Sequence, residues 1–351
     1  MKLNGAQIIV KMLENYGIKV VAGIPGGMIL PLYNELNRSS IKHILVRHEQ
    51  AAGFIAQGIA RTTGRPAVCM ATSGPGAMNL LTAIADARAD SVPVIAITGQ
   101  VNTTQIGTDA FQEADTFGLS FPITKHSILV KKTEELMDAI HKAFEVSVTG
   151  RPGPVLIDVP RDVQLKEIEV TKAKLDTAQK SAAEFLSGKA LCFRGDNVKF
   201  HADKKEFTDK LEQMYKALSE SKKPVLFCGG GCNSEAASKE IARLTKAYSL
   251  PVVTSLMGLG CIPESSSCFI GMVGMHGSYA SNVAMHEADL VIAAGVRFDD
   301  RATGLVKQFC PNAKIIHIDI DAAEIDKILE SSISIVADVE SVLCALATLE
   351  A

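Results

Sequence analysis

The feature that most constrains this sequence is an alternation of short apolar runs and helical patterns. In residues 1–165 helical patterns cover Gln50–Thr63, Ala77–Arg88 and Thr133–Thr149. Alternation of this kind requires right-handed crossovers and predicts a doubly wound parallel sheet, in which ligands bind beyond the carboxyl ends of the strands. The predicted strands are Val20–Ile24, His43–Arg47, Ala67–Thr72, Pro93–Thr98 and Val155–Val159.

The pattern changes over residues 166–222, where Lys, Glu, Ala and Ser dominate, and we interpret this stretch as a connector ending in a helix at Glu206–Ser219. A second α/β domain over 223–351 contains a predicted helix at Ser234–Tyr248. We therefore expect an α/β protein with two doubly wound parallel-sheet domains. The predicted strands of the second domain are Pro224–Cys228, Pro251–Ser255, Leu290–Ala294, Ile315–Ile320 and Ile333–Val336.

Composition argues against several classes of partner. The net charge of the 351 residues is −3 and no basic stripe is interleaved with aromatic residues, so nucleic acid is not expected. Apolar runs such as Leu290–Gly295 are too short to span a membrane, and Met1–Lys11 is typical of the start of an amphipathic helix. The eight scattered cysteines are typical of reduced thiols. We expect a cytoplasmic protein with no metal site of its own.

An acid stands where a predicted strand passes into a helix. Glu49 follows a run that we interpret as a buried, central strand, and it opens the next helix. The acid could serve only to complement the positive helix end. Alternatively, a partly desolvated carboxyl group beside glycine-rich turns could share a proton with a ligand nitrogen. We expect His48 to cap or orient the helix.

Glycine-rich turns follow three of the predicted strands, at Gly23–Gly27, Ser73–Gly76 and Gly99–Gln100. Such turns could serve only to reverse the chain, because glycine tolerates positive φ and proline stiffens a loop. They could also let the backbone approach a flat ligand ring closely. Glu49 upstream and Asn79 downstream favour the second interpretation for Ser73–Gly76.

Long blocks of the chain follow one family pattern. They include GIPGGMILPLYNEL (23–36), RHEQAAGFIAQGIARTTG (47–64), TSGPGAMNLLTAIADA (72–87), GTDAFQEAD (107–115), GRPGPVLIDVPRDVQ (150–164) and EADLVIAAGVRFDDR (287–301). With these blocks the chain resembles the catalytic large subunits of the acetolactate synthase (acetohydroxyacid synthase) family, which are thiamine-diphosphate enzymes. The resemblance covers most of both domains but not residues 180–206. It implies a pyrimidine-binding domain over 1–165, followed by a Rossmann-like FAD-binding middle domain over 223–351.

The resemblance also implies roles for individual residues. Glu49 would hydrogen-bond the aminopyrimidine ring of thiamine diphosphate and so activate the cofactor, and Gly27 and Gln112 would complete the catalytic set. Met28 stands where the family usually has a smaller residue, so it could narrow the pocket. Further cofactor contacts would come from Pro25, Gly26, Ser73, Gly74 and Asn79, and the substrate pocket from Met28, Phe111, Gln112 and Lys125.

The second domain resembles the biosynthetic, FAD-containing branch of the family, mainly through the block from Gly295 to Arg301. The flavin would be structural. The residues implied to contact FAD are Arg151, His276, Gly277, Gly295, Arg297, Asp319, Asp321 and Asp338.

The family also has a third domain, which binds the cofactor's diphosphate through Mg²⁺, and its motif is not found before Ala351. We therefore expect this chain alone to be inactive, whether it is a fragment, a shortened gene product or half of a split enzyme. The full enzyme would condense two pyruvates, or pyruvate and 2-ketobutyrate, for valine, leucine and isoleucine biosynthesis. It would be a homodimer or homotetramer, with a small regulatory subunit as a further partner.

Two alternatives remain open at this stage. The chain could belong to another thiamine-diphosphate enzyme, such as a pyruvate oxidase or an oxo-acid decarboxylase, although the blocks at 107–115 and 123–126 argue against this. It could also be a non-catalytic FAD-binding assembly module.

Overall fold

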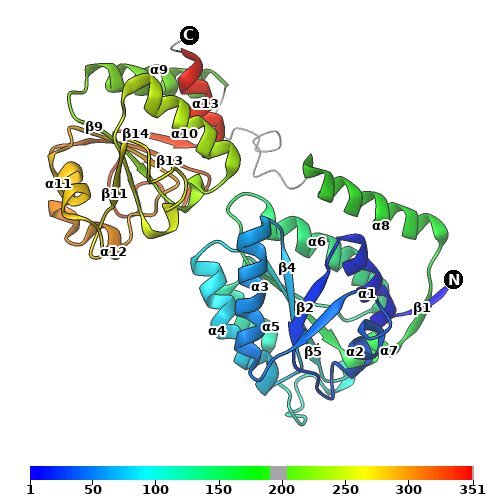
Figure 1. Ribbon diagram of the computed structural model, residues 1–351. Coiled ribbons are helices and arrows are strands. Elements are labelled where there is room, and N and C mark those ends of the chain that lie inside the picture. Colours follow the sequence, from blue (N-terminus) through cyan, green and yellow to red (C-terminus); the bar gives the residue numbers. More distant parts are fainter. Residues whose placement is uncertain (190–203, 350–351) are drawn as a thin grey trace. The chain divides into compact units, whose positions relative to one another are not determined.

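The computed structural model describes residues 1–189 and 204–349, and the chain divides into two compact units, Met1–Cys192 and Phe193–Ala351 (Figure 1). The first unit is built on a six-stranded parallel sheet of order β3-β2-β4-β5-β7-β6. Its strands are β2 (Val20–Gly23), β3 (Lys42–Leu45), β4 (Ala67–Ala71), β5 (Val94–Gln100), β6 (His126–Leu129) and β7 (Val155–Pro160). Among these, β6 lies outside the predicted strands.

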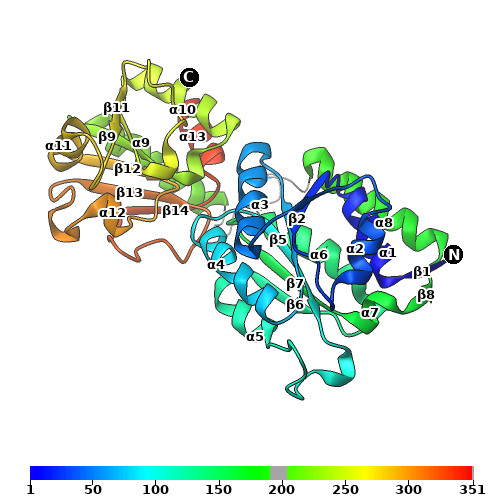
Figure 2. The ribbon, with the colours of Figure 1, turned by 60° about the horizontal axis from the view of Figure 1, so that its bottom comes forward.

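The two faces of this sheet carry side chains of different size. Val68 and Met70 of β4 pack with the layer of α1 (Gly5–Asn15), α2 (Leu30–Leu36) and α6 (Leu136–Val148). The alternate residues Ala67, Cys69 and Ala71 face α3 (Glu49–Thr63) and α4 (Pro75–Ala89), as the two-residue period of a strand requires. Figures 1 and 2 show α3 and α4 on one side of the sheet and α1, α2 and α6 on the other.

Small residues let α3 and α4 approach closely. A Cβ atom added at Gly53 of α3 would lie 2.5 Å from the Cβ of Ala83 on α4. Gln57, one turn further along α3, donates a hydrogen bond from Nε2 to the carbonyl of Ala83 at 2.8 Å. The first half of α3 and the middle of α4 are therefore held side by side.

The remaining elements of the first unit surround the sheet. Asn4 caps α1 in a reciprocal capping box with Gln7, in which each backbone N–H is bonded to the other side chain. The helix α8 (Lys172–Glu184) was not predicted from the sequence. Only its Ala182 is fully buried, so the segment has no apolar period. The other elements are β1 (Lys2–Asn4), which pairs with β8 (Glu167–Glu169), and α5 (Thr116–Ser120), α7 (Arg161–Leu165) and α8 (Lys172–Glu184).

The second unit repeats the same architecture with a parallel sheet of order β11-β10-β9-β12-β13-β14. One face packs on α9 (Lys204–Glu220), α10 (Glu235–Tyr248) and α13 (Val339–Leu349), and the other on α11 (Tyr279–Glu287) and α12 (Asp300–Thr303) (Figure 1). The expected two doubly wound parallel sheets are confirmed, and α9 appears where a helix was predicted. The strands are β9 (Pro224–Cys228), β10 (Val252–Thr254), β11 (Phe269–Met272), β12 (Leu290–Ala294), β13 (Lys314–Asp319) and β14 (Ile333–Val336).

The seven cysteines within residues 1–189 and 204–349 form no disulfide with one another. Five of them are buried, and Cys344 is exposed. Over the same residues, no helix combines the length and the apolar composition needed to cross a membrane.

Candidate functional site

The candidate site lies at the carboxyl edge of the first sheet, where the strands run into glycine-rich turns. Glu49 reaches this edge as the first residue of α3. The strand before it, β3, is the edge strand of the sheet and its side chains are half-buried or exposed, so the expectation of a buried, central strand was wrong. Glu49 is nevertheless only 9% exposed, because α3 packs over β2 and β4.

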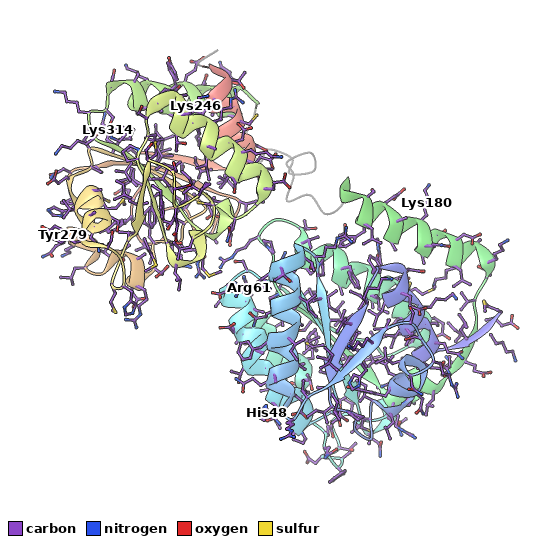
Figure 3. All side chains as sticks on the ribbon, viewed as in Figure 1. His48, Arg61, Lys180, Lys246, Tyr279 and Lys314 are labelled. Carbon is purple, nitrogen blue, oxygen red and sulfur yellow. The ribbon has the colours of Figure 1, made fainter. Side chains whose placement is uncertain are left out.

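His48 is the N-cap of α3, as expected (Figure 3). Its Nδ1 accepts a hydrogen bond from the backbone N–H of Gln50 at 3.2 Å, which satisfies a donor that the first helical turn would otherwise leave open. The side chain of His48 thus caps the amino-terminal end of α3.

The carboxyl group of Glu49 is held on one side only. Its Oε2 accepts a hydrogen bond from Asn79 Nδ2 on α4 at 3.0 Å. None of the described residues donates to its Oε1, and a Cβ atom at Gly76 would lie 3.4 Å from that oxygen. Asn79 fixes the orientation of the acid, and Oε1 remains available to a ligand.

The turns after β2 and β4 meet at Thr72. A Cβ atom at Gly26 would lie 2.6 Å from Thr72 Cβ, and the same atom at Gly76 would lie 2.8 Å from Thr72 Cγ2. Met28 donates its backbone N–H to Thr72 Oγ1 at 3.4 Å. Pro25 and Gly27 are exposed at the outer side of the turn, and a side chain at Gly27 would meet nothing within 4 Å.

Gly74 has a φ of +57°, and a Cβ atom there would lie 2.5 Å from the carbonyl oxygen of Gln112. A loop distant in sequence therefore crosses directly over this turn. Gln112 itself has a φ of +56°, which is strained for a residue with a side chain. Phe111 beside it is 82% exposed.

This edge fits a polar, flat ligand. Ser73 at the end of β4 is fully buried, and its hydroxyl has no hydrogen-bond partner, although a buried polar group normally has one. Glu49 Oε1 lies beside Gly76 in the same region, where Thr72 packs against the backbone of Gly26 and Gly76. These features suit the ring nitrogen and face of an aminopyrimidine.

Lys125 lies at a different place in the unit. It precedes β6, so it is at the amino edge of the sheet, opposite to Glu49. Its Nζ donates to the carbonyls of Val146 at 2.5 Å and Thr149 at 2.6 Å, where a cation complements the carboxyl end of α6. A place for Lys125 in a substrate pocket stays a prediction, and it would require the Glu49 of another chain.

The residues predicted to contact FAD in the second unit gather at the carboxyl edge of its sheet. Asp319 is buried and its Oδ1 accepts the backbone N–H of Asp321 at 2.9 Å. Burial raises the pKa of Asp338 to about 6, against the effect of hydrogen bonds from the backbone N–H groups of Ser341 and Glu340. The others at this edge are His276 and Gly277 after β11, and Gly295 and Arg297 after β12.

Glycines at this second edge pack against one another. A Cβ atom at Gly229 would lie 2.0 Å from the carbonyl oxygen of Gly295, and a Cβ atom at Gly231 would lie 2.8 Å from the Cα of Gly295. These glycines are thus required by the packing of two backbone turns, whether or not a dinucleotide binds.

Thr254 at the end of β10 is fully buried with an unpartnered hydroxyl, which fits a polar ligand there. Arg151 belongs to the first unit, where its Nε donates to Ser91 Oγ at 2.8 Å.

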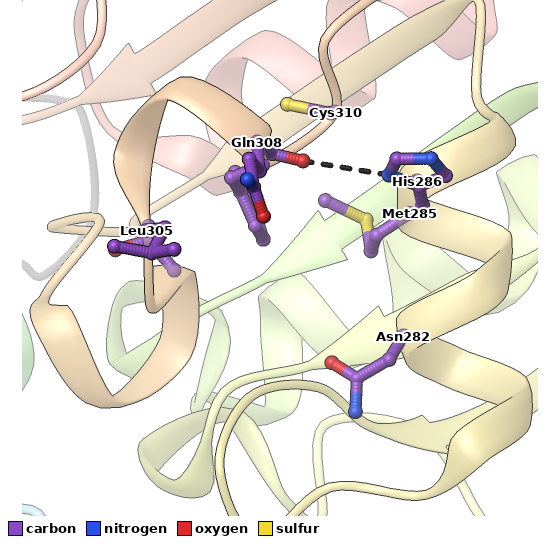
Figure 4. Close-up of a pocket in the computed structure, with 8 residues that line it drawn as sticks. Asn282, Met285, His286, Leu305, Gln308 and Cys310 are labelled. Atoms are coloured by element: carbon purple, nitrogen blue, oxygen red, sulfur yellow. Dashed lines mark hydrogen bonds between the residues drawn. The ribbon is translucent and has the colours of Figure 1, made fainter.

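The second unit also contains a pocket of about 260 Å³ between α11 and the segment 303–310 (Figure 4). His286 lines it, with Nδ1 at 3.4 Å from the carbonyl oxygen of Gln308. None of the residues predicted to contact FAD lines this pocket.

The sequence placed Thr72 and Gln100 at strand ends but gave neither a role in the site, where they join the turns of the first edge. The available signal was a polar side chain at the end of a predicted apolar strand, since such a residue is buried and needs a partner.

Comparison with known proteins gives matches over both units. Residues 3–119 match the family model for the N-terminal TPP binding domain of thiamine pyrophosphate enzymes, and residues 211–346 match the model for their central domain. The chain is 50% identical over 347 residues to the acetolactate synthase isozyme 1 large subunit of Escherichia coli, covering 98% of this chain and 58% of that protein.

It is 48% identical to the probable acetolactate synthase large subunit of Methanocaldococcus jannaschii, with 97% of this chain and 55% of that protein aligned. For the acetolactate synthase large subunit of Corynebacterium glutamicum, the identity is 46% and the shares are 98% and 52%. The chain thus spans somewhat more than half the length of these relatives.

Proposed function

Since this chain belongs to the thiamine pyrophosphate enzyme family, we propose that it forms part of the catalytic subunit of an acetolactate synthase. The subunit would condense two pyruvates to 2-acetolactate and CO₂, or pyruvate with 2-ketobutyrate. The names of the relatives support this activity. The observation that carries it is the buried carboxyl group of Glu49, which is bonded to Asn79 on one oxygen and open on the other.

In this proposal Glu49 Oε1 holds a proton at the ring nitrogen of the aminopyrimidine, and Asn79 keeps the carboxyl group in the required orientation. The unpartnered hydroxyl of Ser73 supplies a polar contact, and Gly27, where an added Cβ atom would meet nothing within 4 Å, leaves room beside the turn. Thiamine diphosphate, when bound, supplies the carbanion chemistry. Phe111 and Gln112 would contact the substrate from the loop above Gly74.

The proposal also includes FAD, Mg²⁺ and partner subunits. FAD would bind at the carboxyl edge of the second sheet, where the buried hydroxyl of Thr254 is unpartnered and the acids Asp319 and Asp338 lie at the strand ends. Mg²⁺ would accompany the diphosphate of the cofactor. A second copy of the subunit and a small regulatory subunit are the proposed partners, in the cytoplasm.

The test is reconstitution. The chain is mixed with the part of the E. coli relative that it does not span, together with thiamine diphosphate, Mg²⁺ and FAD, and acetolactate is measured from pyruvate. We expect acetolactate from the mixture and none from this chain alone. Formation of acetaldehyde or acetate instead would contradict the proposed reaction. Titration with FAD alone tests the second unit, and absence of binding at micromolar FAD would contradict its proposed role.

A further inference from the structure

The loop of residues 101–115, called here the crossing loop, lies over Gly74 and carries Phe111 and Gln112. Phe111 is 82% exposed, so the loop is not anchored by burial of its large aromatic side chain. Its position must therefore come from hydrogen bonds.

Carboxylates hold the crossing loop in shape. Glu113 accepts the backbone N–H groups of Gly107, Thr108 (3.3 Å) and Ala110 (3.0 Å), and these bonds lower its pKa. At the start of the loop, Asp162 of α7 accepts the backbone N–H of Thr103 at 3.0 Å. These bonds close the loop on itself and fasten its first residues, but they do not fix the end that crosses Gly74.

That end is fastened to the sheet by Gln100, the last residue of β5. Its Nε2 donates to the carbonyl of Ala114 at 2.9 Å and to Asp158 Oδ2 at 2.9 Å, and its Oε1 accepts the N–H of Val101 at 2.8 Å. Asp158 on β7 is 1% exposed, and its Oδ1 accepts the hydroxyl of Thr98 at 2.7 Å. The carboxyl group therefore fixes which way the amide of Gln100 points.

We propose that Gln100 and Asp158 are positioning residues, which hold the crossing loop over Gly74 so that Phe111 and Gln112 face the ligand at Glu49. The identity of that ligand rests on the proposed function, whereas the anchoring does not. Asp158 acts only through Gln100, since its two oxygens are both used inside the sheet.

The chemistry of Asp158 predicts which substitution it tolerates. Burial raises its pKa to about 7, with a contribution from the charge of Asp115, the N-cap of α5, while the hydrogen bonds from Thr98 and Gln100 lower it. A protonated acid can donate from one oxygen to the Thr98 hydroxyl and accept from Gln100 on the other. Asparagine offers the same donor and acceptor, so Asp158→Asn should keep the anchor.

The experiment is amide hydrogen exchange on the whole chain without ligand, measured on the crossing loop and, as a reference for global stability, on β4. Gln100→Leu and Asp158→Leu should speed exchange in the crossing loop by about tenfold, the effect of losing one buried hydrogen bond, with β4 protected as before. Asp158→Asn should stay within about twofold of the parent. Asp176→Asn, an exposed acid on α8, is the control and should change nothing.

Exchange in the crossing loop that is unchanged in Gln100→Leu would overturn the proposal, as would a faster loop in Asp158→Asn. If the leucine variants do not fold, Asp158→Asn combined with Gln100→Leu avoids an unpaired buried carboxyl group and gives the same comparison. Because no cofactor is added, failure here is distinct from failure to form acetolactate in the reconstituted mixture.

Discussion

The two units share one architecture but treat an acid at the same helical position differently. Glu49 opens α3 and Glu235 opens α10, each after a turn that follows a strand. Glu49 is 9% exposed and bonded to a neighbouring helix. The side chain of Glu235 is 85% exposed and pairs with Lys239 one turn along its own helix, at 2.7 Å. A helix-start acid therefore becomes a candidate catalytic group only where a second helix buries it.

The comparison predicts the largest effect for neutralising these two acids. Glu49→Gln should lower acetolactate formation by the reconstituted mixture roughly 10²-fold to 10⁴-fold, the range for loss of a positioned proton-transfer group. Glu235→Gln removes a surface ion pair and should change the rate less than about twofold. Initial rates at saturating thiamine diphosphate give the measurement. Equal losses in both variants would break the comparison.

A second contrast concerns glycines of positive φ at the two carboxyl edges. Alanine at Gly295 meets the backbone of Gly231 at a neighbouring strand end, whereas alanine at Gly74 meets the backbone of Gln112 in the crossing loop. The ψ of Gly74 is −119°, outside the left-handed helical region, so alanine there adds backbone strain to this clash. We expect Gly295→Ala to lower the free energy of unfolding of its unit by about 3 kcal/mol or more, and Gly74→Ala by about 2–3 kcal/mol.

Gly64→Ala is the control for a positive φ without a clash, because its φ of +65° and ψ of +19° are left-handed helical and nothing lies within 4 Å, so only a backbone cost of about 1 kcal/mol remains. Urea titration measures all three, and exchange in the crossing loop should change only in Gly74→Ala. A greater loss from Gly64→Ala than from Gly295→Ala would contradict the packing argument.

The smallest expected effects come from one acid in each unit, Asp158 and Asp338. The pKa of Asp158 is raised to about 7 and that of Asp338 to about 6, both by burial. Between an unfolded-state pKa of about 4 and these values the folded chain binds more protons than the unfolded chain, so stability falls as pH rises. Asp158→Asn should flatten this decline between about pH 4 and 7, and Asp338→Asn between about pH 4 and 6.

Urea midpoints at several pH values, followed by exchange in β5 for the first unit and β13 for the second, measure these slopes. Asp176→Asn serves as the control. An unchanged slope in Asp158→Asn would show that this acid ionises alike in both states.

The sequence predicted the architecture well because strand–helix alternation is a local, repeated signal. It predicted that Glu49, Ser73, Gly74 and Asn79 would meet, since residues after parallel strands share one edge of a sheet. The sequence did not predict the features that depend on the order of strands in the sheet. The strand before Glu49 lies at the edge of the sheet, because strand order depends on crossovers that no local pattern records.

Other residues escaped prediction because their partners are far away in the sequence. Gln100 and Asp158 stand 58 residues apart, and the apolar runs around them indicate only that both are buried. Lys125 carries a charge that the family resemblance assigned to a pocket, yet its carbonyl partners lie on α6. The helix α8 has too few buried residues to give an apolar period.

The close crossing of α3 and α4 at Gly53 and Ala83 has a consequence for how this site can change over evolutionary time. The separation between Glu49 and Asn79 depends on the close approach of Gly53 and Ala83 one turn away as well as on their own hydrogen bond. A methyl group added at Gly53 would force the helices apart and stretch the 3.0 Å bond between the acid and the amide. The orientation of the acid is therefore encoded in a position that carries no side chain, and drift at that position would alter the chemistry while every polar residue of the site stayed in place.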